Sequence, residues 1–245
     1  DKLGLFGEDI NDQILIMELL TWMHKNKADY TNTFCFLMNE RFSDNEIYND
    51  ESFLIWKKKW DSVLEWDFSK PEIKWFKGAK LNITENCIDR HLKKNASKTA
   101  IIWVGDDPAD SKKISYKELH QNVCRVANGL KSIGVQKGDR VTIYLTMIPE
   151  LAYVMLACAR IGAIHSIIFG GFSPDSIATR ITDCESEYLI TADEGVRGGK
   201  IIPLKKIADE ALQQCPDVKK CVVIERTGNQ VNWNDERDIS YKKLV

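Results

Sequence analysis

The chain has 245 residues, of which 44% are hydrophobic and 29% are charged, and its formal net charge is −2. This length can bury a substantial core, and the composition is typical of a globular protein and unlike that of a disordered one. The small net charge gives no indication of nucleic acid as a partner. The longest apolar run, residues 151–159, is far shorter than the roughly 20 residues of a membrane-spanning helix, so no membrane partner is expected.

The seven cysteines show neither a Cys-x-x-Cys pair nor a grouping with histidine at zinc-site spacing. Their scatter predicts a reducing compartment, without disulfides and without a metal site. The chain begins at Asp1 with no signal-peptide pattern and no initiator Met, which indicates an incomplete N-terminus. A cytoplasmic location is expected, and the nucleus and the mitochondrial matrix remain open alternatives.

Residues 1–60 have a helical pattern, because apolar residues recur near a helical period at Ile14, Met17 and Leu20. A polar stretch, residues 39–52, separates these helices from an aromatic segment that begins at residue 53. The pattern predicts a short α-helical segment ahead of the main fold.

From residue 99 onward, apolar strands alternate with amphipathic helices. A strand at 99–104 and a turn at 106–113 precede a helix that starts with the capping box of Ser115 and Glu118 and ends at Gly134. Further strands are expected at 140–145, 163–169, 187–192 and 220–225, and further helices from Pro149, from Ser173–Pro174 and over 203–213. Apolar strands joined by helices indicate an α/β fold with a parallel sheet flanked by helices.

A glycine pair, Gly170 and Gly171, stands between two phenylalanines in "FGGF" at the end of the strand 163–169. Ligands of open parallel sheets bind beyond the carboxyl ends of the strands, where glycine lets the backbone approach closely and phenylalanine offers flat apolar surface. Glycines at a strand end are also ordinary turn residues, and this alternative stays open at this point.

A second glycine pair follows the strand 187–192, flanked by two cations in "RGGK", residues 197–200. Arginine can hold a phosphate in two-pronged fashion, and lysine can act as a point charge beside it. The segment lacks the glycine spacing and the Ser or Thr of a P-loop, and neither pair matches G-x-G-x-x-G. The alternative is a solvated loop with surface charges.

Other candidate residues carry weaker signals. His165 lies within an apolar strand and is interpreted as a core histidine with satisfied hydrogen bonds rather than a catalytic base. Asp106 and Asp107 have the residue types of a metal pair, but "GDDPADS" is more typical of a turn. Four tryptophans are interpreted as packing residues of an interdomain surface: Trp56, Trp60, Trp66 and Trp75.

Several segments resemble the acetyl-CoA synthetase branch of the acyl-adenylate-forming ligases, in order and nearly without gaps over about residues 60–245. They include "WFKGAKLN", "AIIWVGDDP", "MIPELAYVMLACARIGAIHSIIFGGFS" and "ITADEGVRGGKIIPLK". The resemblance implies an AMP-forming acetate–CoA ligase, which uses acetate, ATP with Mg²⁺, and coenzyme A and passes through acetyl-AMP. It divides the chain into 1–60, an N-terminal extension at 61–98, and a partial AMP-dependent ligase domain at 99–245.

The resemblance also assigns site residues. Arg197, Gly198, Gly199 and Lys200 correspond to the family segment that holds the phosphates at the nucleotide end of coenzyme A. A further group, beside the same ligand, consists of Phe169, Gly170 and Gly171. The family's ATP loop, acyl-pocket tryptophan and catalytic lysine have no counterpart in these 245 residues, so no catalytic residue is assigned and the chain alone is expected to be inactive.

Residues 1–60 do not fit the usual start of such a synthetase. "KLGL", "LLTWMHKNKADYTNTF" and "FLIWKKKW" instead resemble the C-terminal helical part of the selenoprotein O pseudokinases. Either a fusion of two gene fragments or a mispredicted gene model would explain this pattern. A non-catalytic binding or interaction module, or an inactive fusion remnant, is therefore the alternative function, and the sequence predicts no oligomeric state.

Overall fold

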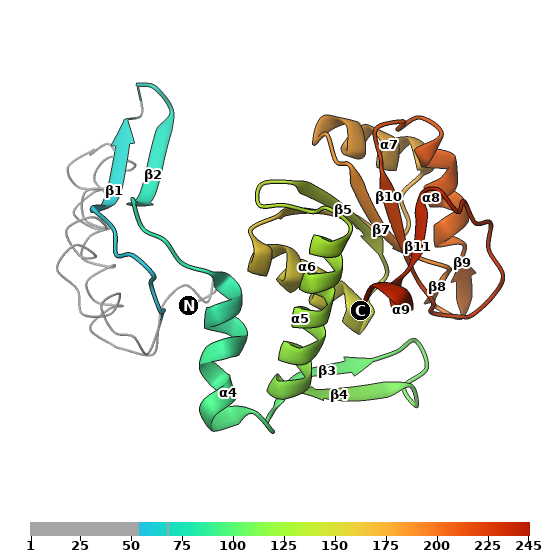
Figure 1. Ribbon diagram of the computed structural model, residues 1–245, viewed down its shortest axis with the longest axis horizontal. Helices are drawn as coiled ribbons and strands as arrows, with labels where there is room; N and C mark the ends of the chain where they lie inside the picture. Colours follow the sequence, from blue (N-terminus) through green and yellow to red (C-terminus); the bar gives the residue numbers. More distant parts are fainter. Residues whose placement is uncertain (1–53, 68) are drawn as a thin grey trace, which may run out of the picture. The chain divides into compact units, whose positions relative to one another are not determined.

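The computed structural model describes residues 54–67 and 69–245, which fall into two compact units that divide between Leu81 and Asn82 (Figure 1). The helices predicted for residues 1–60 and the polar stretch 39–52 lie almost wholly outside the described residues. Residues 54–60, the described end of this segment, contain no helix, and Lys58 forms an isolated antiparallel bridge with Lys80.

The described part of the first unit is an antiparallel hairpin of β1 (Ser62–Asp67) and β2 (Glu72–Lys77). Near the base of the hairpin, Trp56, Trp60 and Phe76 form an aromatic cluster, with ring centroids 5.3–5.4 Å apart. Trp56 and Trp60 therefore pack within this unit, whereas Trp75 remains 46% exposed.

The second unit begins with the π-helix η1 (Glu85–Asp89) and the helix α4 (Arg90–Asn95). An antiparallel hairpin follows, formed by β3 (Thr99–Val104) and β4 (Ser111–Ser115). The prediction that 99–104 begins the parallel series is wrong, and so is the extension of the turn to residue 113. Parallel neighbours need a long crossover connection, whereas the few residues between β3 and β4 permit only an antiparallel pair.

The five-stranded sheet is parallel throughout and has the order β11-β10-β7-β5-β6. Its strands are β5 (Arg140–Leu145), β6 (Ile164–Phe169), β7 (Tyr188–Ala192), β10 (Lys220–Ile224) and β11 (Asp238–Ser240). The predicted strands at 140–145, 163–169, 187–192 and 220–225 are confirmed to within a residue at each end. β11 is an additional edge strand of only three residues, too short for its sequence to show a pattern.

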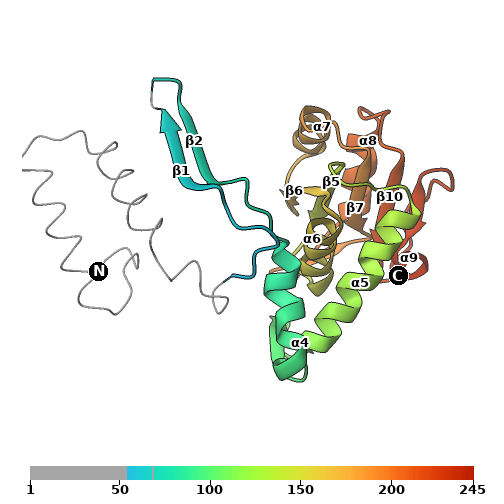
Figure 2. The ribbon, with the colours of Figure 1, turned by 60° about the vertical axis from the view of Figure 1, so that its left-hand side comes forward.

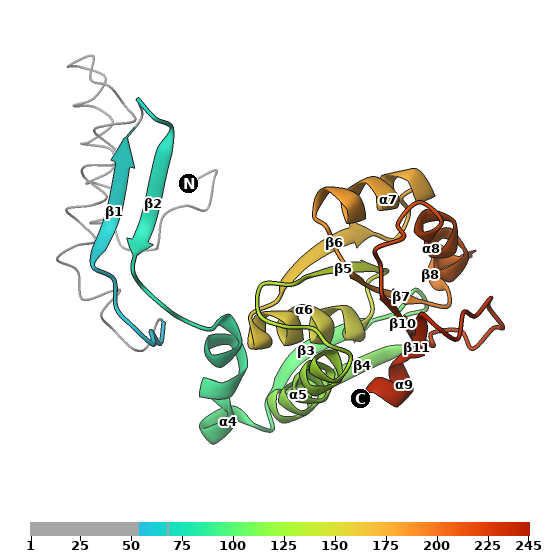
Figure 3. The ribbon, with the colours of Figure 1, turned by 45° about the horizontal axis from the view of Figure 1, so that its top comes forward.

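Helices cover the two faces of the sheet (Figures 1 and 3). One face carries the packed pair α5 (Tyr116–Ser132) and α6 (Pro149–Ile161), whose neighbouring positions are clear in Figure 2, and the other carries α7 (Pro174–Asp183) and α8 (Leu204–Leu212). The short α9 (Tyr241–Leu244) packs against α5. The α/β fold with a parallel sheet flanked by helices is thus confirmed.

Local sequence signals define the helix starts. The Ser115 side chain accepts a hydrogen bond from the Glu118 backbone while the Glu118 carboxylate accepts one from the Ser115 backbone, which completes the predicted capping box of α5. Pro149 occupies the first turn of α6, and Ser173 caps α7 ahead of Pro174. The signals that mark these helix starts all lie within a few residues of each start.

The core lies between the sheet and the two helix pairs, where Val141, Ile143, Leu189 and Val222 are almost completely inaccessible to solvent. The edge strand β6 differs, because its Ile164, Ile167 and Phe169 side chains are 43–55% exposed. Both faces of the central strands are covered by helices, as the apolar runs predict, but part of β6 faces solvent.

Candidate functional site at the carboxyl end of the sheet

The two glycine segments lie close together at the end of β5. A Cβ atom added to Gly170 would stand 2.9 Å from the Cγ2 atom of Thr146, the residue that follows β5, and one added to Gly195 would meet the same methyl group. The Arg197 guanidinium lies over the Phe169 ring, 4.9 Å from its centroid. Segments that are separate in sequence thus form one surface, with Thr146 between them.

This surface lies at the point in the sheet where the chain changes the side on which it adds the next strand. β6 and β7 flank β5 on opposite sides in the sheet. The chain leaves β5 toward α6 on one face of the sheet and leaves β7 toward α8 on the opposite face (Figure 3). Neighbouring loops that leave toward opposite faces open a crevice, and ligands of open α/β sheets bind at such switch points. The topology therefore places both glycine segments where a ligand is expected.

The "RGGK" segment is the tip of a β-hairpin formed by β8 (Gly195–Arg197) and β9 (Lys200–Ile202). Gly198 and Gly199, the two turn residues, have φ angles of +58° and +72°. Two-residue turns between antiparallel strands favour positive φ at both positions, which is why glycine is common there. An added Cβ atom would meet nothing within 4 Å at either glycine, so the requirement is conformational and not steric.

The hairpin places its two cations directly opposite each other, because Arg197 and Lys200 are register partners. Like charges in such cross-strand positions repel each other and are destabilising. Among the described residues, neither cation forms an ion pair with a carboxylate. The arrangement can therefore stabilise an anion that both side chains approach.

The backbone of the same turn already holds a carboxylate. The Gly198 and Gly199 amides donate hydrogen bonds of 2.7 Å to Oδ1 and Oδ2 of Asp106, respectively. These two bonds keep the pKa of Asp106 below its usual value of 3.8. Consecutive backbone amides that converge on one anion form a nest of the kind that also binds phosphate.

Asp106 lies in the turn of the β3–β4 hairpin, whose tip approaches the β8–β9 hairpin (Figure 1). Its neighbour Asp107 points elsewhere and accepts a hydrogen bond of 2.9 Å from the Ala109 amide. The turn interpretation of this segment is confirmed. Among residues 54–67 and 69–245, no three His, Cys, Asp or Glu side chains are grouped closely enough to hold a metal ion.

The base of the β8–β9 hairpin is held by Asp193, whose side chain is buried. Its carboxylate accepts backbone hydrogen bonds of 2.8 Å from Arg226 and from Gly228, and another of 3.1 Å from Thr227. Asp193 is not among the site residues predicted from the sequence. An acidic residue at the end of an apolar strand is a sequence signal for such a role. The loop that Asp193 binds could not be predicted from it, because this loop lies more than 30 residues farther along the chain.

His165 differs from its interpretation as a core histidine with satisfied hydrogen bonds. The residue is only partly buried, and its Nδ1 atom is shielded from water without a hydrogen-bond partner. The outer position of β6 in the sheet explains the partial burial, since no further described strand covers this edge. The ring does not contact the glycine segments through any hydrogen bond among the described residues.

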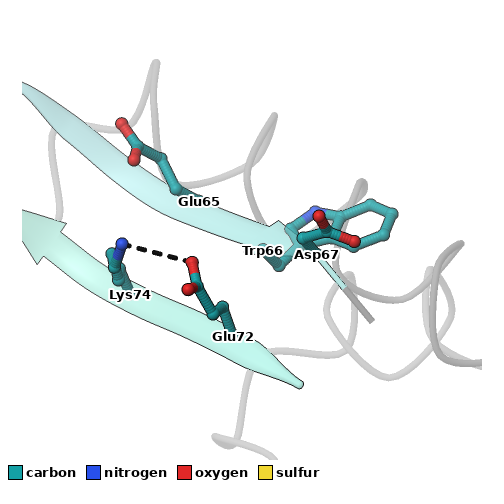
Figure 4. A pocket seen from close by; sticks show the side chains of 5 residues that line it. All are labelled: Glu65, Trp66, Asp67, Glu72 and Lys74. Atoms are coloured by element: carbon teal, nitrogen blue, oxygen red, sulfur yellow. Dashed lines mark hydrogen bonds and ion pairs between the residues drawn. The ribbon is translucent and has the colours of Figure 1, made fainter. Parts of the chain in front are cut away.

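A separate hollow of about 160 Å³ lies on the β1–β2 hairpin (Figure 4). It is lined by Glu65, Trp66, Asp67, Glu72 and Lys74. Each of its carboxylates already has a local partner: Glu65 pairs with Lys77 at 2.7 Å, Glu72 with Lys74 at 3.3 Å, and Asp67 with the Ser69 hydroxyl. Because these acids are neutralised or capped within the hairpin, the hollow does not resemble a cation site.

Comparison with known proteins supports the interpretation of the larger unit. The family model described as AMP-binding enzyme matches residues 88–243. The chain belongs to the AMP-binding enzyme family. A second model, described as acetyl-coenzyme A synthetase N-terminus, matches residues 47–87 and so begins ahead of the boundary predicted at residue 61. The region matched by the first model includes both glycine segments.

Individual relatives point to the same branch of AMP-binding enzymes. The chain is 57% identical to an acetyl-coenzyme A synthetase of Alkalilimnicola ehrlichii over 80% of its own length, and 58% identical to acetyl-coenzyme A synthetase 2 of Pseudomonas aeruginosa over the same share. With the synthetase of Halorhodospira halophila the match is 53% identical and covers 88% of the chain. The chain spans about a third or less of the length of these relatives, and its similarity is to their N-terminal part.

No helix in the described part of the chain is both long enough and apolar enough to cross a bilayer.

Proposed function

We propose that the chain is the N-terminal part of an AMP-forming acetate–CoA ligase and that its β8–β9 turn binds a phosphate of coenzyme A. In this reaction a carboxylate oxygen of acetate attacks the α-phosphorus of ATP and pyrophosphate leaves. The thiol of coenzyme A then attacks the acyl carbon of acetyl-AMP, and AMP leaves. The similarity to acetyl-coenzyme A synthetases supports the reaction class.

One observation carries the assignment of the turn: Arg197 and Lys200 face each other across a two-glycine hairpin, with no ion-pair partner among the described carboxylates. Phosphate suits this arrangement, because guanidinium and ammonium groups both bind it and the backbone amides of the turn add further donors. Without a bound anion, the two like charges in register repel each other.

The phenylalanine segment completes the proposed site. Phe169 packs beneath the Arg197 guanidinium and limits the directions that the guanidinium can take. Gly170 follows directly and fits closely against Thr146, which keeps the backbone near the end of β5. Phe169, Gly170 and Gly171 thus form the proposed wall beside the phosphate, while ATP, Mg²⁺ and acetate are proposed substrates of a complete ligase. The bacterial origin of the relatives named above supports the cytoplasm as the compartment.

Isothermal titration of coenzyme A into the 245-residue chain tests the proposal. Arg197→Ala is expected to weaken binding about 10- to 150-fold, the factor that a charge-assisted contact supplies. Lys200→Ala is expected to act in the same direction but less strongly, because the flexible ammonium loses more entropy per contact. Arg180→Ala is the matched control, since Arg180 also lies over a phenylalanine ring, that of Phe172, but outside the turn.

The choice of ligand separates the phosphate from the rest of the molecule. Dephospho-coenzyme A lacks the 3′-phosphate. If this phosphate is the one bound, the unaltered chain should bind dephospho-coenzyme A more weakly than coenzyme A. The Arg197→Ala variant should bind the two ligands with about the same affinity. If Arg197→Ala and Arg180→Ala both bind coenzyme A as tightly as the unaltered chain does, the turn is not part of the site, and the alternative of a charged surface loop is favoured.

A further inference from the structure

The contact between Asp106 and the glycine turn has a geometry that matters for any phosphate ligand. Both carboxylate oxygens are used, one for each amide, and both donor–acceptor distances are 2.7 Å. Each backbone amide has one hydrogen to donate, so the donors of Gly198 and Gly199 are fully occupied by Asp106. A phosphate oxygen that uses these amides can reach them only after the carboxylate has left.

Contacts other than those of Asp106 also hold the β3–β4 hairpin in place. The Trp103 indole donates a hydrogen bond of 2.7 Å to the Met147 backbone carbonyl, and the Arg226 guanidinium pairs with Asp110 at 2.7 Å. Arg226 also lies over the Trp103 ring, 5.2 Å from its centroid. These contacts hold the hairpin on both sides of its turn, so release of the Asp106 carboxylate needs only a local change in the turn.

We infer that Asp106 is an internal competitor of the phosphate ligand: its carboxylate occupies the anion nest of Gly198 and Gly199 and is displaced when phosphate binds beside Arg197 and Lys200. When no ligand is bound, the carboxylate holds the two glycines in their turn conformation. Because its hydrogen bonds to the two amides must break before phosphate binds there, it lowers the affinity for the ligand. The inference rests on the proposed function, because it takes the β8–β9 turn to be a phosphate-binding element.

The test compares Asp106→Asn with Asp107→Asn in the 245-residue chain. The two variants lose the same charge at neighbouring positions of the same turn, but only Asp106 contacts the glycine amides. Coenzyme A and inorganic phosphate are titrated separately, and binding is followed by the ¹H–¹⁵N NMR signals of Gly198 and Gly199 and by calorimetry. Asp106→Asn is expected to bind either ligand about three- to tenfold more tightly than Asp107→Asn, a factor typical of one or two net hydrogen bonds in an exposed turn.

The two ligands separate this inference from the proposed function. Coenzyme A binding that depends on Arg197 but is equal or weaker in Asp106→Asn would overturn the competitor role and leave the proposed function standing. Tighter binding of inorganic phosphate by Asp106→Asn, with no binding of coenzyme A by any variant, would support the competitor role and refute the coenzyme A assignment. If neither ligand shifts the Gly198 and Gly199 signals in any variant, both proposals fail.

Discussion

Lys205 and Asp238 form an ion pair that is almost completely shielded from water. The Lys205 Nζ atom lies 2.8 Å from Oδ2 of Asp238, and the two side chains are 1% and 0% exposed. Lys205 also binds Asp209 at 2.7 Å, and Arg237 binds both Asp209 and Asp238, so two cations and two carboxylates form a closed network. The network joins α8 to the edge strand β11, and each buried charge in it has a partner of opposite sign.

Lys205→Met is expected to destabilise the second unit by about 3–5 kcal/mol, because it leaves the fully buried carboxylate of Asp238 to share Arg237 with the partly exposed Asp209. Lys206→Met is the matched control, since Lys206 is the next residue and its side chain is exposed. The control should change the free energy of unfolding by less than about 0.5 kcal/mol. Urea unfolding followed by circular dichroism measures both, and a loss below about 1 kcal/mol in Lys205→Met would contradict the stabilising role of the network.

Asp238 should also make stability depend on pH in the acid range. Burial raises its pKa, but hydrogen bonds from Arg237 and Lys205 outweigh burial and hold the pKa below the usual 3.8. As the pH falls, the unfolded chain binds the proton first, so the contribution of Asp238 is complete above about pH 3.8 and is lost as the pH falls through the lower folded-state pKa. The difference in stability between the unaltered chain and Asp238→Asn should be constant from pH 5 to 7 and should shrink below about pH 4.

The exposed Asp235→Asn is the control for this pH series. If the difference in stability between the unaltered chain and Asp238→Asn instead grows as the pH falls, the pKa of Asp238 in the folded chain is not depressed.

The cysteines of the described residues should differ strongly in reactivity. Burial raises the pKa of the Cys158 and Cys221 thiols to about 12, whereas Cys87 is exposed. Because the thiolate is the reactive form, iodoacetamide at pH 8 should alkylate Cys87 long before the two buried cysteines. Peptide mass spectrometry over time measures the order, with a sample in urea as the control in which all three react. Rapid alkylation of Cys221 in the folded chain would contradict its burial.

The 245-residue chain alone is expected to form no acetyl adenylate. The chain spans about 30% of the length of the synthetases that it matches, and the cations of the β8–β9 turn are assigned to coenzyme A rather than to the α-phosphate of ATP. Acetate-dependent exchange of labelled pyrophosphate into ATP is the measurement, with a full-length acetyl-coenzyme A synthetase of Pseudomonas aeruginosa as the positive control. Exchange above background by the purified chain would overturn this prediction.

Much of the fold could be predicted because its signals are local. A capping box, a proline in the first helical turn and an apolar strand each act within a few residues, and the structure confirms them at Ser115, Pro149 and β5. The strand at 99–104 was also located correctly, but its assignment to the parallel series was wrong. The strand with which another strand pairs depends on the length of the connection between them and on residues distant in the sequence. The periodicity of a single strand gives no information about either.

The sequence by itself determined the residue types of the proposed site: two glycines able to adopt positive φ, and one cation on each side of them. Only the tertiary structure decided that these cations stand in register and that Phe169 lies under Arg197. Only the tertiary structure could place Asp106 on the Gly198 and Gly199 amides, because the contact joins the tips of two hairpins that are more than 90 residues apart in the chain. Turn propensity is a property of neighbouring residues, whereas the anion that a turn holds depends on which other segment the fold brings against it.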